Sequence, residues 1–364
     1  MKAQLLKMTE NTSGRNINID ILRGFAALMV VVIHVFNNTR GAEVLSPYLL
    51  SITSWGVPSF FIVSGFLVGS RNNGLHLLGA LNIILRLVSI YLVGIFFYFA
   101  TDFGTFKENG LIFSIQYLIS GQPNARHLWF LLSMIFGYGA LCVLFMATNR
   151  IFIAFVSVIL IIIGLMINPY PVLYDAMNAT GQRVLMLLYP HFLSIPLIYF
   201  GFLVGESRIQ NHLRPLFMAI FSIASLVLAV LEGVYAYSYG ATSQFYAWTY
   251  FLSAGIFIFA VTAQPPSGKI FKVIALVGER YSLIIYIYHL FILNSFGLLI
   301  FNNAEINPIV SILANSILSY IGLAAVFFAL DRINRRIMWV LDGSVMFYVL
   351  EGTMRRLTSR IVRS

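Results

Sequence analysis

Residues 19–37 read IDILRGFAALMVVVIHVFN, an apolar stretch that carries Arg23 near its start and His34 near its end. If this stretch is a helix, the eleven-residue separation places the two side chains on nearly the same face, about 16 Å apart along the axis. Asp20 lies three residues before Arg23, close enough on a helix to pair with the guanidinium at the membrane boundary. The stretch therefore predicts a first membrane span with an acid, a base and an imidazole along one side.

The composition of the whole chain is that of an integral membrane protein. Of its 364 residues, 59% are hydrophobic and only 10% are charged, which excludes an ordinary soluble globule. Arginine and lysine in cytoplasmic loops explain the net charge of +10 better than a nucleic-acid partner does. The single cysteine, Cys142, has no intrachain partner, and no metal-binding spacing such as CxxC or HExxH occurs, so we expect no metal site.

Apolar runs long enough to cross about 30 Å of hydrocarbon predict an all-α polytopic bundle of about ten transmembrane helices. We expect these helices at residues 19–37, 49–69, 77–100, 127–146, 151–167, 184–205, 214–234, 246–263, 281–301 and 309–330. The runs are almost continuously apolar and lack the alternation of barrel strands, which favours helices over an outer-membrane barrel.

The distribution of basic residues predicts the orientation. With the N-terminus inside, 17 of the 23 lysines and arginines fall in cytoplasmic segments and 4 fall on the opposite side. We therefore expect both termini in the cytoplasm. Residues 1–331 are predicted to form a single transmembrane domain, and residues 332–364 a basic tail that lies along the inner leaflet.

Titratable side chains at membrane depth are functional candidates by default. Beyond the first span these are Arg86, His127, which Trp129 closely follows, His191 and His289. Arg86 lies too deep to reach the membrane surface easily, which favours a buried ion pair or an anion ligand.

Several of these candidates also have structural explanations. Arg23 can extend its side chain to lipid phosphates, and His34 can be an interfacial histidine. Trp129 fits an aromatic belt, and His289 can hydrogen-bond across a helix pair. Ser64 and its neighbour Gly65, in PSFFIVSGFLVG at residues 58–69, are most simply a close helix contact.

The first-span sequence DILRGFAALMVVVIHVF resembles the signature of the membrane acyltransferase 3 family, in which an arginine and a histidine are separated by ten residues. The segments at residues 58–69, HLWFLLSMIFGY at 127–138 and SLIIYIYHLFI at 282–292 also resemble family segments, in the family order. The family tends to show two arginines three residues apart at the start of the third span. This chain has Ile83 at the first position and keeps Arg86 at the second.

The resemblance implies transfer of an acyl group, most often acetyl, from cytoplasmic acyl-CoA to a hydroxyl of a surface polysaccharide or a lipid-linked glycan. It implies that Arg23 and His34 are the essential pair, in a bacterial cytoplasmic membrane. Acetyl-CoA or another acyl-CoA would be a donor substrate, with no tightly bound cofactor.

The chemistry of the residues fits such a transfer. Arg86 and Arg23 would hold the donor phosphates. The imidazole of His34 would accept the proton of the attacking hydroxyl or take the acyl group itself, with Asp20, His127, Trp129, His289 and Ser64 in support.

Two other classes of membrane protein are alternatives to an acyltransferase. A transporter or flippase would use the same buried charges to move its substrate without making or breaking bonds. A glycan polymerase or ligase would place its key arginines in large outward loops, and these loops are poor in arginine here.

Overall fold

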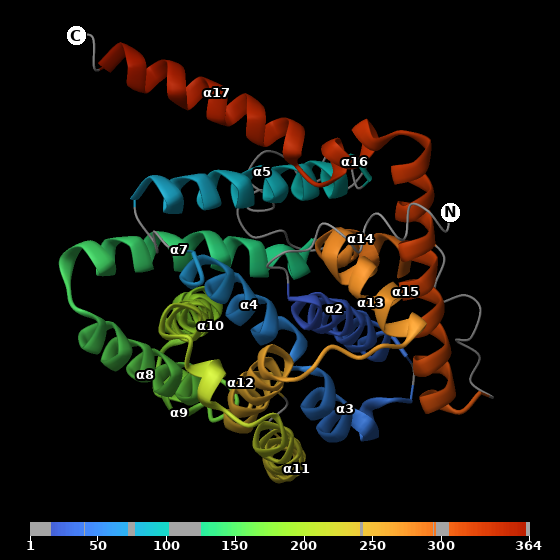
Figure 1. The fold of residues 1–364 in the computed structure, drawn as a ribbon. Coiled ribbons are helices and arrows are strands. Elements are labelled where there is room, and N and C mark those ends of the chain that lie inside the picture. Colours follow the sequence, from blue (N-terminus) through green and yellow to red (C-terminus); the bar gives the residue numbers. More distant parts are fainter. Residues whose placement is uncertain are drawn as a thin grey trace.

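The computed structural model describes residues 16–39, 41–71, 77–101, 125–240, 243–293, 295 and 306–361. Within these ranges all regular elements are helices (Figure 1). Eight helical stretches of the described chain are long and apolar enough to cross a membrane. They are α2 (Ile17–Asn37), η1 (Glu43–Leu45) with α3 (Ser46–Thr53) and α4 (Gly56–Gly69), α5 (Leu77–Thr101), η2 (Arg126–Leu128) with α7 (Trp129–Ala147), α8 (Arg150–Ile167), α10 (Ala179–Ser207), α11 (Pro215–Ser238) and α15 (Pro308–Ile333).

Two further apolar helices are shorter: α12 (Ala247–Thr262) and α14 (Ser282–Ile292). The chain is therefore a polytopic helical bundle, as the hydropathy predicted, while the number ten and the side of the termini stay predictions. The second half of the predicted span 281–301 lies largely outside the described residues. The remaining elements are α9 (Val172–Asp175), η3 (Ile209–His212), α13 (Lys269–Arg280), α16 (Arg335–Leu341) and α17 (Ser344–Ile361).

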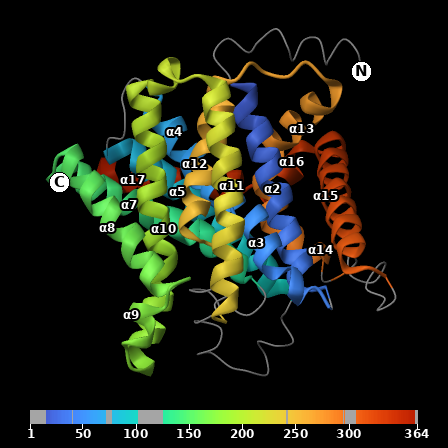
Figure 2. The ribbon, with the colours of Figure 1, turned by 90° about the horizontal axis from the view of Figure 1, so that it is seen from below.

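Helix α2 lies inside the bundle. It contacts α3, α4, α12, α13, α14 and α15, and in Figure 2 its axis lies roughly parallel to the axes of α10 and α11, with α10 running in the opposite chain direction. The side chain of Asn16 accepts a hydrogen bond of 3.0 Å from the backbone nitrogen of Asn18, which caps the first turn. Because the helix is unbroken from Ile17 to Asn37, Arg23 and His34 stay about 16 Å apart along a single axis.

Helices α4 and α10 pack backbone against backbone. Both carry the pentapeptide GFLVG, at residues 65–69 and 201–205, so each has two glycines four residues apart. A methyl group added at Gly65 would overlap the backbone oxygen of Ile198, and one at Gly201 would overlap that of Ile62. Such spacing of small residues lets helices approach closely in membranes. The close helix contact predicted at Gly65 is thus present.

Helix α13 was not predicted from the sequence, and it packs against the first half of α2. A methyl group added at Gly278 would overlap the backbone oxygen of Asp20 and lie 2.7 Å from the backbone nitrogen of Gly24. Helix α14 follows directly in the chain and contacts α2 as well, with His289 beside His34. Two consecutive helices therefore cover one side of α2, from its acidic first turn to its histidine.

The C-terminal helices α16 and α17 pack against α5, and Figure 1 shows α17 running alongside it. Gly343 lies against the backbone of Ser89 and Ile90, and the hydroxyl of Tyr288 donates a 3.2 Å hydrogen bond to the backbone oxygen of Leu341. The tail is thus attached to the bundle through α5 and α14. Its predicted position along the inner leaflet stays a prediction.

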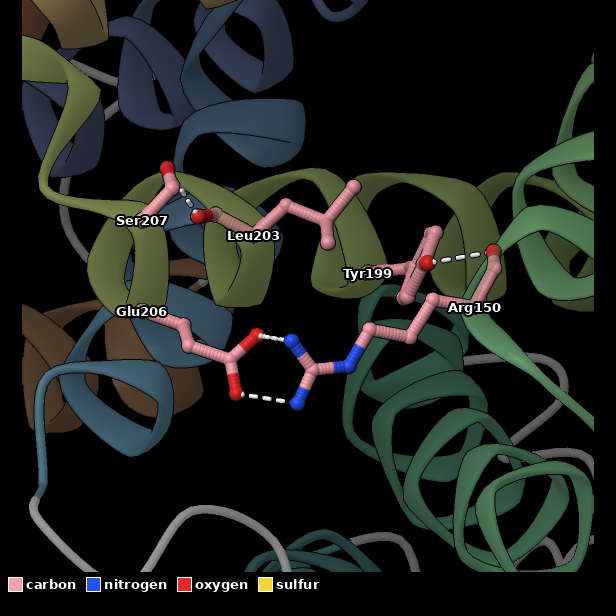
Figure 3. A network of polar contacts seen from close by, with 5 residues as sticks. All are labelled: Arg150, Tyr199, Leu203, Glu206 and Ser207. Carbon is pink, nitrogen blue, oxygen red and sulfur yellow. Dashed lines mark hydrogen bonds and ion pairs between the residues drawn. The ribbon is translucent and has the colours of Figure 1, made fainter.

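An ion pair joins α8 to α10 (Figure 3). The two terminal nitrogens of the Arg150 guanidinium face the two carboxylate oxygens of Glu206, and Nη2 donates to Oε1 at 2.6 Å. The hydroxyl of Tyr199 donates to the backbone oxygen of Arg150 at 2.7 Å. The Arg150 side chain is 60% exposed, so the pair contributes no more than about 1 kcal/mol.

Candidate active site

Three imidazoles from distant parts of the chain meet beside the end of α2. His34 comes from α2, His127 from η2 and His289 from α14. The ring centroids of His34 and His289 are 4.8 Å apart, those of His127 and His289 5.1 Å, and those of His34 and His127 6.3 Å. The sequence left open whether His127 or His289 accompanies His34, and the structure places both there. We call this group the histidine cluster.

Hydrogen bonds fix the tautomer of His127. Its Nε2 lies 2.7 Å from the backbone oxygen of Ile287, which can only accept, so Nε2 carries the proton of the neutral ring. The hydroxyl of Tyr286 donates to the backbone oxygen of His127, and that of Tyr98 donates to the oxygen of Ile287 at 2.9 Å. The Nδ1 of His127 therefore presents a buried lone pair, which has no partner among the described residues.

The tautomer of His289 is fixed in the opposite sense. Its Nδ1 lies 2.7 Å from the backbone oxygen of Tyr286 and 3.2 Å from that of Ile285, so the proton is on Nδ1. Its Nε2 is then the lone-pair nitrogen, and it too is buried without a partner in the described part of the chain. Each of these two histidines thus offers one acceptor nitrogen.

The burial of the three rings differs. His127 and His289 are 2% and 0% exposed, whereas His34 keeps part of its surface accessible. A buried acceptor left without a hydrogen bond lowers the stability of a fold by about 1–3 kcal/mol, so two such atoms in one place indicate a functional role. A neutral imidazole can take a proton from a hydroxyl or attack a carbonyl carbon. The arrangement suits proton transfer, with His34 as the ring that a substrate can reach.

The opposite end of α2 carries the charged pair. A distance of 3.8 Å separates Arg23 Nη1 from Asp20 Oδ1, as the three-residue spacing predicted. The Arg23 side chain is 25% exposed, so its guanidinium is not enclosed. A second ion pair joins the end of α13 to α15: Arg280 lies 3.5 Å from Asp331, which also accepts a 3.2 Å hydrogen bond from the hydroxyl of Tyr281.

Trp129, at the start of α7, lies two residues after His127 and lines a cavity of about 700 Å³. The other predicted residues lie elsewhere. Ser64 shares a 2.6 Å hydrogen bond with the hydroxyl of Tyr138. His191 stacks near Phe136, with ring centroids 4.5 Å apart, and is not part of the histidine cluster.

Arg86 is exposed on α5, so the buried ion pair predicted as one explanation of this residue is wrong, while its role in holding a donor stays a prediction. Among the residues that the structure describes, no three histidine, cysteine or acidic side chains are arranged to hold a metal ion.

Comparison with known proteins identifies a family. A family model described as an acyltransferase domain matches residues 16–330, a range that contains Arg23 and all three members of the histidine cluster. No curated protein and no solved structure matches the chain.

Proposed function

This chain belongs to the acyltransferase 3 family, and from that premise we propose that it is a membrane O-acyltransferase that moves an acetyl group from acetyl-CoA to a hydroxyl of a surface polysaccharide or of a lipid-linked glycan precursor. The observation that supports this most directly is the histidine cluster, in which one accessible imidazole lies beside two buried ones with free acceptor nitrogens. The proposed setting is the bacterial cytoplasmic membrane, with both termini and the Arg23 end of α2 in the cytoplasm.

The donor is proposed to bind at the Arg23 end. A guanidinium suits the phosphates of acyl-CoA, because it forms charge-assisted hydrogen bonds and keeps its charge at any physiological pH. Arg23 and His34 lie about 16 Å apart on one unbroken helix. A donor that engages both must therefore be extended, with its phosphates at one end and its thioester at the other.

The chemistry is proposed to take place at His34. Its imidazole accepts the proton of the acceptor hydroxyl while the hydroxyl oxygen attacks the thioester carbon. The carbon–sulfur bond then breaks, and the departing thiolate of CoA takes the proton from the imidazolium. An ester and a free thiol result, and His34 returns to its neutral form. The buried lone pairs of His127 and His289 lie beside the His34 ring, where an acceptor nitrogen stabilises the imidazolium that forms during the transfer.

The test uses the purified full-length chain in nanodiscs, with labelled acetyl-CoA and a glycolipid extract of the source membrane as acceptor. We expect release of free CoA thiol together with the gain of one acetyl mass by the glycolipid. The His34→Ala variant should lose about 10²–10⁴-fold in rate, the usual contribution of a positioned acid–base group. His212→Ala is the matched control, because His212 is exposed in η3 and outside the cluster.

Two results would overturn the proposal. A folded His34→Ala protein with the activity of the wild type would remove the imidazole from the chemistry. Absence of any protein-dependent CoA release, together with movement of glycolipid between leaflets, would instead identify a transporter.

A further inference from the structure

A cavity at the His34 end of α2 has the size and composition of a small-molecule site. Its volume of about 700 Å³ falls within the range of about 300–1,000 Å³ that ligand pockets occupy. Phe36 and Asn37, which line it, follow His34 on α2, and Trp129 follows His127. Two or three residues of helix advance the chain by only about 3–5 Å, so the lining begins within one turn of His34 along the axis of α2, although no member of the histidine cluster itself lines the cavity.

The lining combines aromatic surfaces with neutral hydrogen-bonding groups. Trp129 and Tyr237 supply rings, and the side chains of Asn37, Asn168 and Gln244 supply amides. An amide both donates and accepts, as a sugar hydroxyl does, and the C–H face of a sugar ring is apolar enough to lie against an aromatic ring. The lining is therefore suited to a polyhydroxylated ligand.

One charged side chain occurs among the described residues that line the cavity. It is Glu43, at the start of η1. Glu43 is exposed, so water screens part of its charge, but its carboxylate still accepts hydrogen bonds from sugar hydroxyls and repels a second carboxylate close to it. Glu43 therefore favours an uncharged ligand over an acidic one.

The connection between α11 and α12, which supplies Ser243, Gln244 and Phe245 to the lining, is anchored to α11 by the partly buried carboxylate of Glu232. Glu232 accepts hydrogen bonds of 2.9 Å from the backbone nitrogens of Ala247 and Trp248, and it also accepts from the hydroxyl of Tyr170. Partial burial, together with the hydrogen bond to Glu232, raises the pKa of the Tyr170 phenol well above its ordinary value. The phenol therefore keeps its proton and stays a hydrogen-bond donor to Glu232.

We propose that this cavity is the acceptor subsite, and that it holds an uncharged sugar whose hydroxyl is presented to His34 while sugars that carry a carboxylate are rejected through Glu43. The inference rests on the proposed function, because it assigns the acceptor of the same reaction. It adds the place of binding, the residues that recognise the sugar and the charge that it must have.

Binding is measured apart from chemistry by using the full-length His34→Ala protein in nanodiscs. Saturation-transfer-difference NMR is recorded with the methyl glycosides of glucose, galactose and mannose, and with the methyl glycosides of glucuronic and galacturonic acid. We expect saturable binding of at least one neutral glycoside, and binding of its uronic counterpart that is about tenfold weaker. Glu43→Gln should reduce that difference to less than about threefold.

Two tyrosines on α11 give a matched pair for the aromatic contact. Tyr237 lines the cavity, whereas Tyr235 is exposed on the same helix and does not line it. Tyr237→Ala should weaken binding of the neutral glycoside about five- to tenfold, as truncation of a contact aromatic commonly does, and Tyr235→Ala should leave it unchanged. Equal effects of the two variants, equal binding of the neutral and acidic glycosides, or no saturable signal would each overturn the inference.

The outcomes separate the subsite from the activity. If the neutral glycoside binds and responds to Tyr237→Ala while the wild type transfers no acetyl group, the subsite stands and the proposed function fails. If the wild type transfers acetyl groups equally to neutral and acidic acceptors, the proposed function stands and the subsite fails.

Discussion

Substitution of Gly278 by alanine tests whether α13 positions the first half of α2. The added methyl group would overlap the backbone oxygen of Asp20 and lie 2.7 Å from the backbone nitrogen of Gly24, whereas ordinary contact begins at 3.4 Å. Both obstacles belong to the backbone of a helix, so no side chain can rotate away. The two helices must separate by roughly 1 Å, which costs about 3 kcal/mol, the upper part of the range for overpacking.

A gain in helix propensity offsets part of this cost. Alanine is favoured over glycine in a helix interior by about 1 kcal/mol, so the net loss for Gly278→Ala is about 2 kcal/mol. The control is Gly322→Ala on α15, because nothing lies within 4 Å of a methyl group added there. That variant receives the propensity gain without the clash and should be stabilised by up to about 1 kcal/mol.

The assay follows thermal unfolding of both variants in detergent by size-exclusion fluorescence, and acetyl transfer well below the melting temperature. Gly278→Ala should melt below the wild type, and its KM for acetyl-CoA should rise, because Arg23 lies on the displaced part of α2. Gly322→Ala should melt at or above the wild type with unchanged KM. If Gly278→Ala had the melting temperature and the KM of the wild type, the close packing of α13 on α2 would be refuted.

Three further predictions concern the polar contacts. His289→Leu should lower kcat at least about tenfold without changing the KM for acetyl-CoA. His289→Gln should lower kcat less, because the amide restores an acceptor near the lost nitrogen. Steady-state kinetics on matched amounts of folded protein measure both effects. Arg23→Ala should raise the KM for acetyl-CoA more than it lowers kcat, and the same kinetics with varied donor test it. Glu206→Gln should change the free energy of unfolding by less than about 1 kcal/mol, because Arg150 is largely exposed. Added salt should make this change smaller, and denaturation at two salt concentrations measures the difference.

Hydropathy predicted most of the long helices because each apolar run must satisfy its own backbone hydrogen bonds in lipid. It missed α13 for a physical reason. KIFKVIALVGER, at Lys269–Arg280, is 12 residues long and carries charges at both ends, so it is too short and too polar for a span. The signal that identifies it is periodicity: Ile270, Ile274 and Val277 recur at helical spacing on one face.

The candidate site was predicted only in part, because its geometry is tertiary. The spacing within one helix was enough to pair Asp20 with Arg23. No local pattern brings His127 and His289 to His34, since they come from segments far apart in the chain, and no pattern reveals which ring nitrogen a distant carbonyl oxygen fixes. The amides that line the cavity, such as Asn168 and Gln244, lie in short connections where polar residues are common, so the sequence gives them no distinguishing signal.

The length of α2 separates the roles of its two functional candidates. At about 16 Å and an effective dielectric constant of about 20, a full positive charge on Arg23 would act on a charge at His34 with only about 1 kcal/mol, which is less than tenfold in rate. Asp20, 3.8 Å from Arg23, cancels much of that field. Under the proposed function, direct stabilisation of the reacting atoms by Arg23 is therefore too weak to make it essential, and we expect its contribution to come through binding of the donor. A loss of kcat greater than about tenfold in Arg23→Ala, with KM unchanged, would mean that the guanidinium acts closer to the reacting atoms than an unbroken α2 permits.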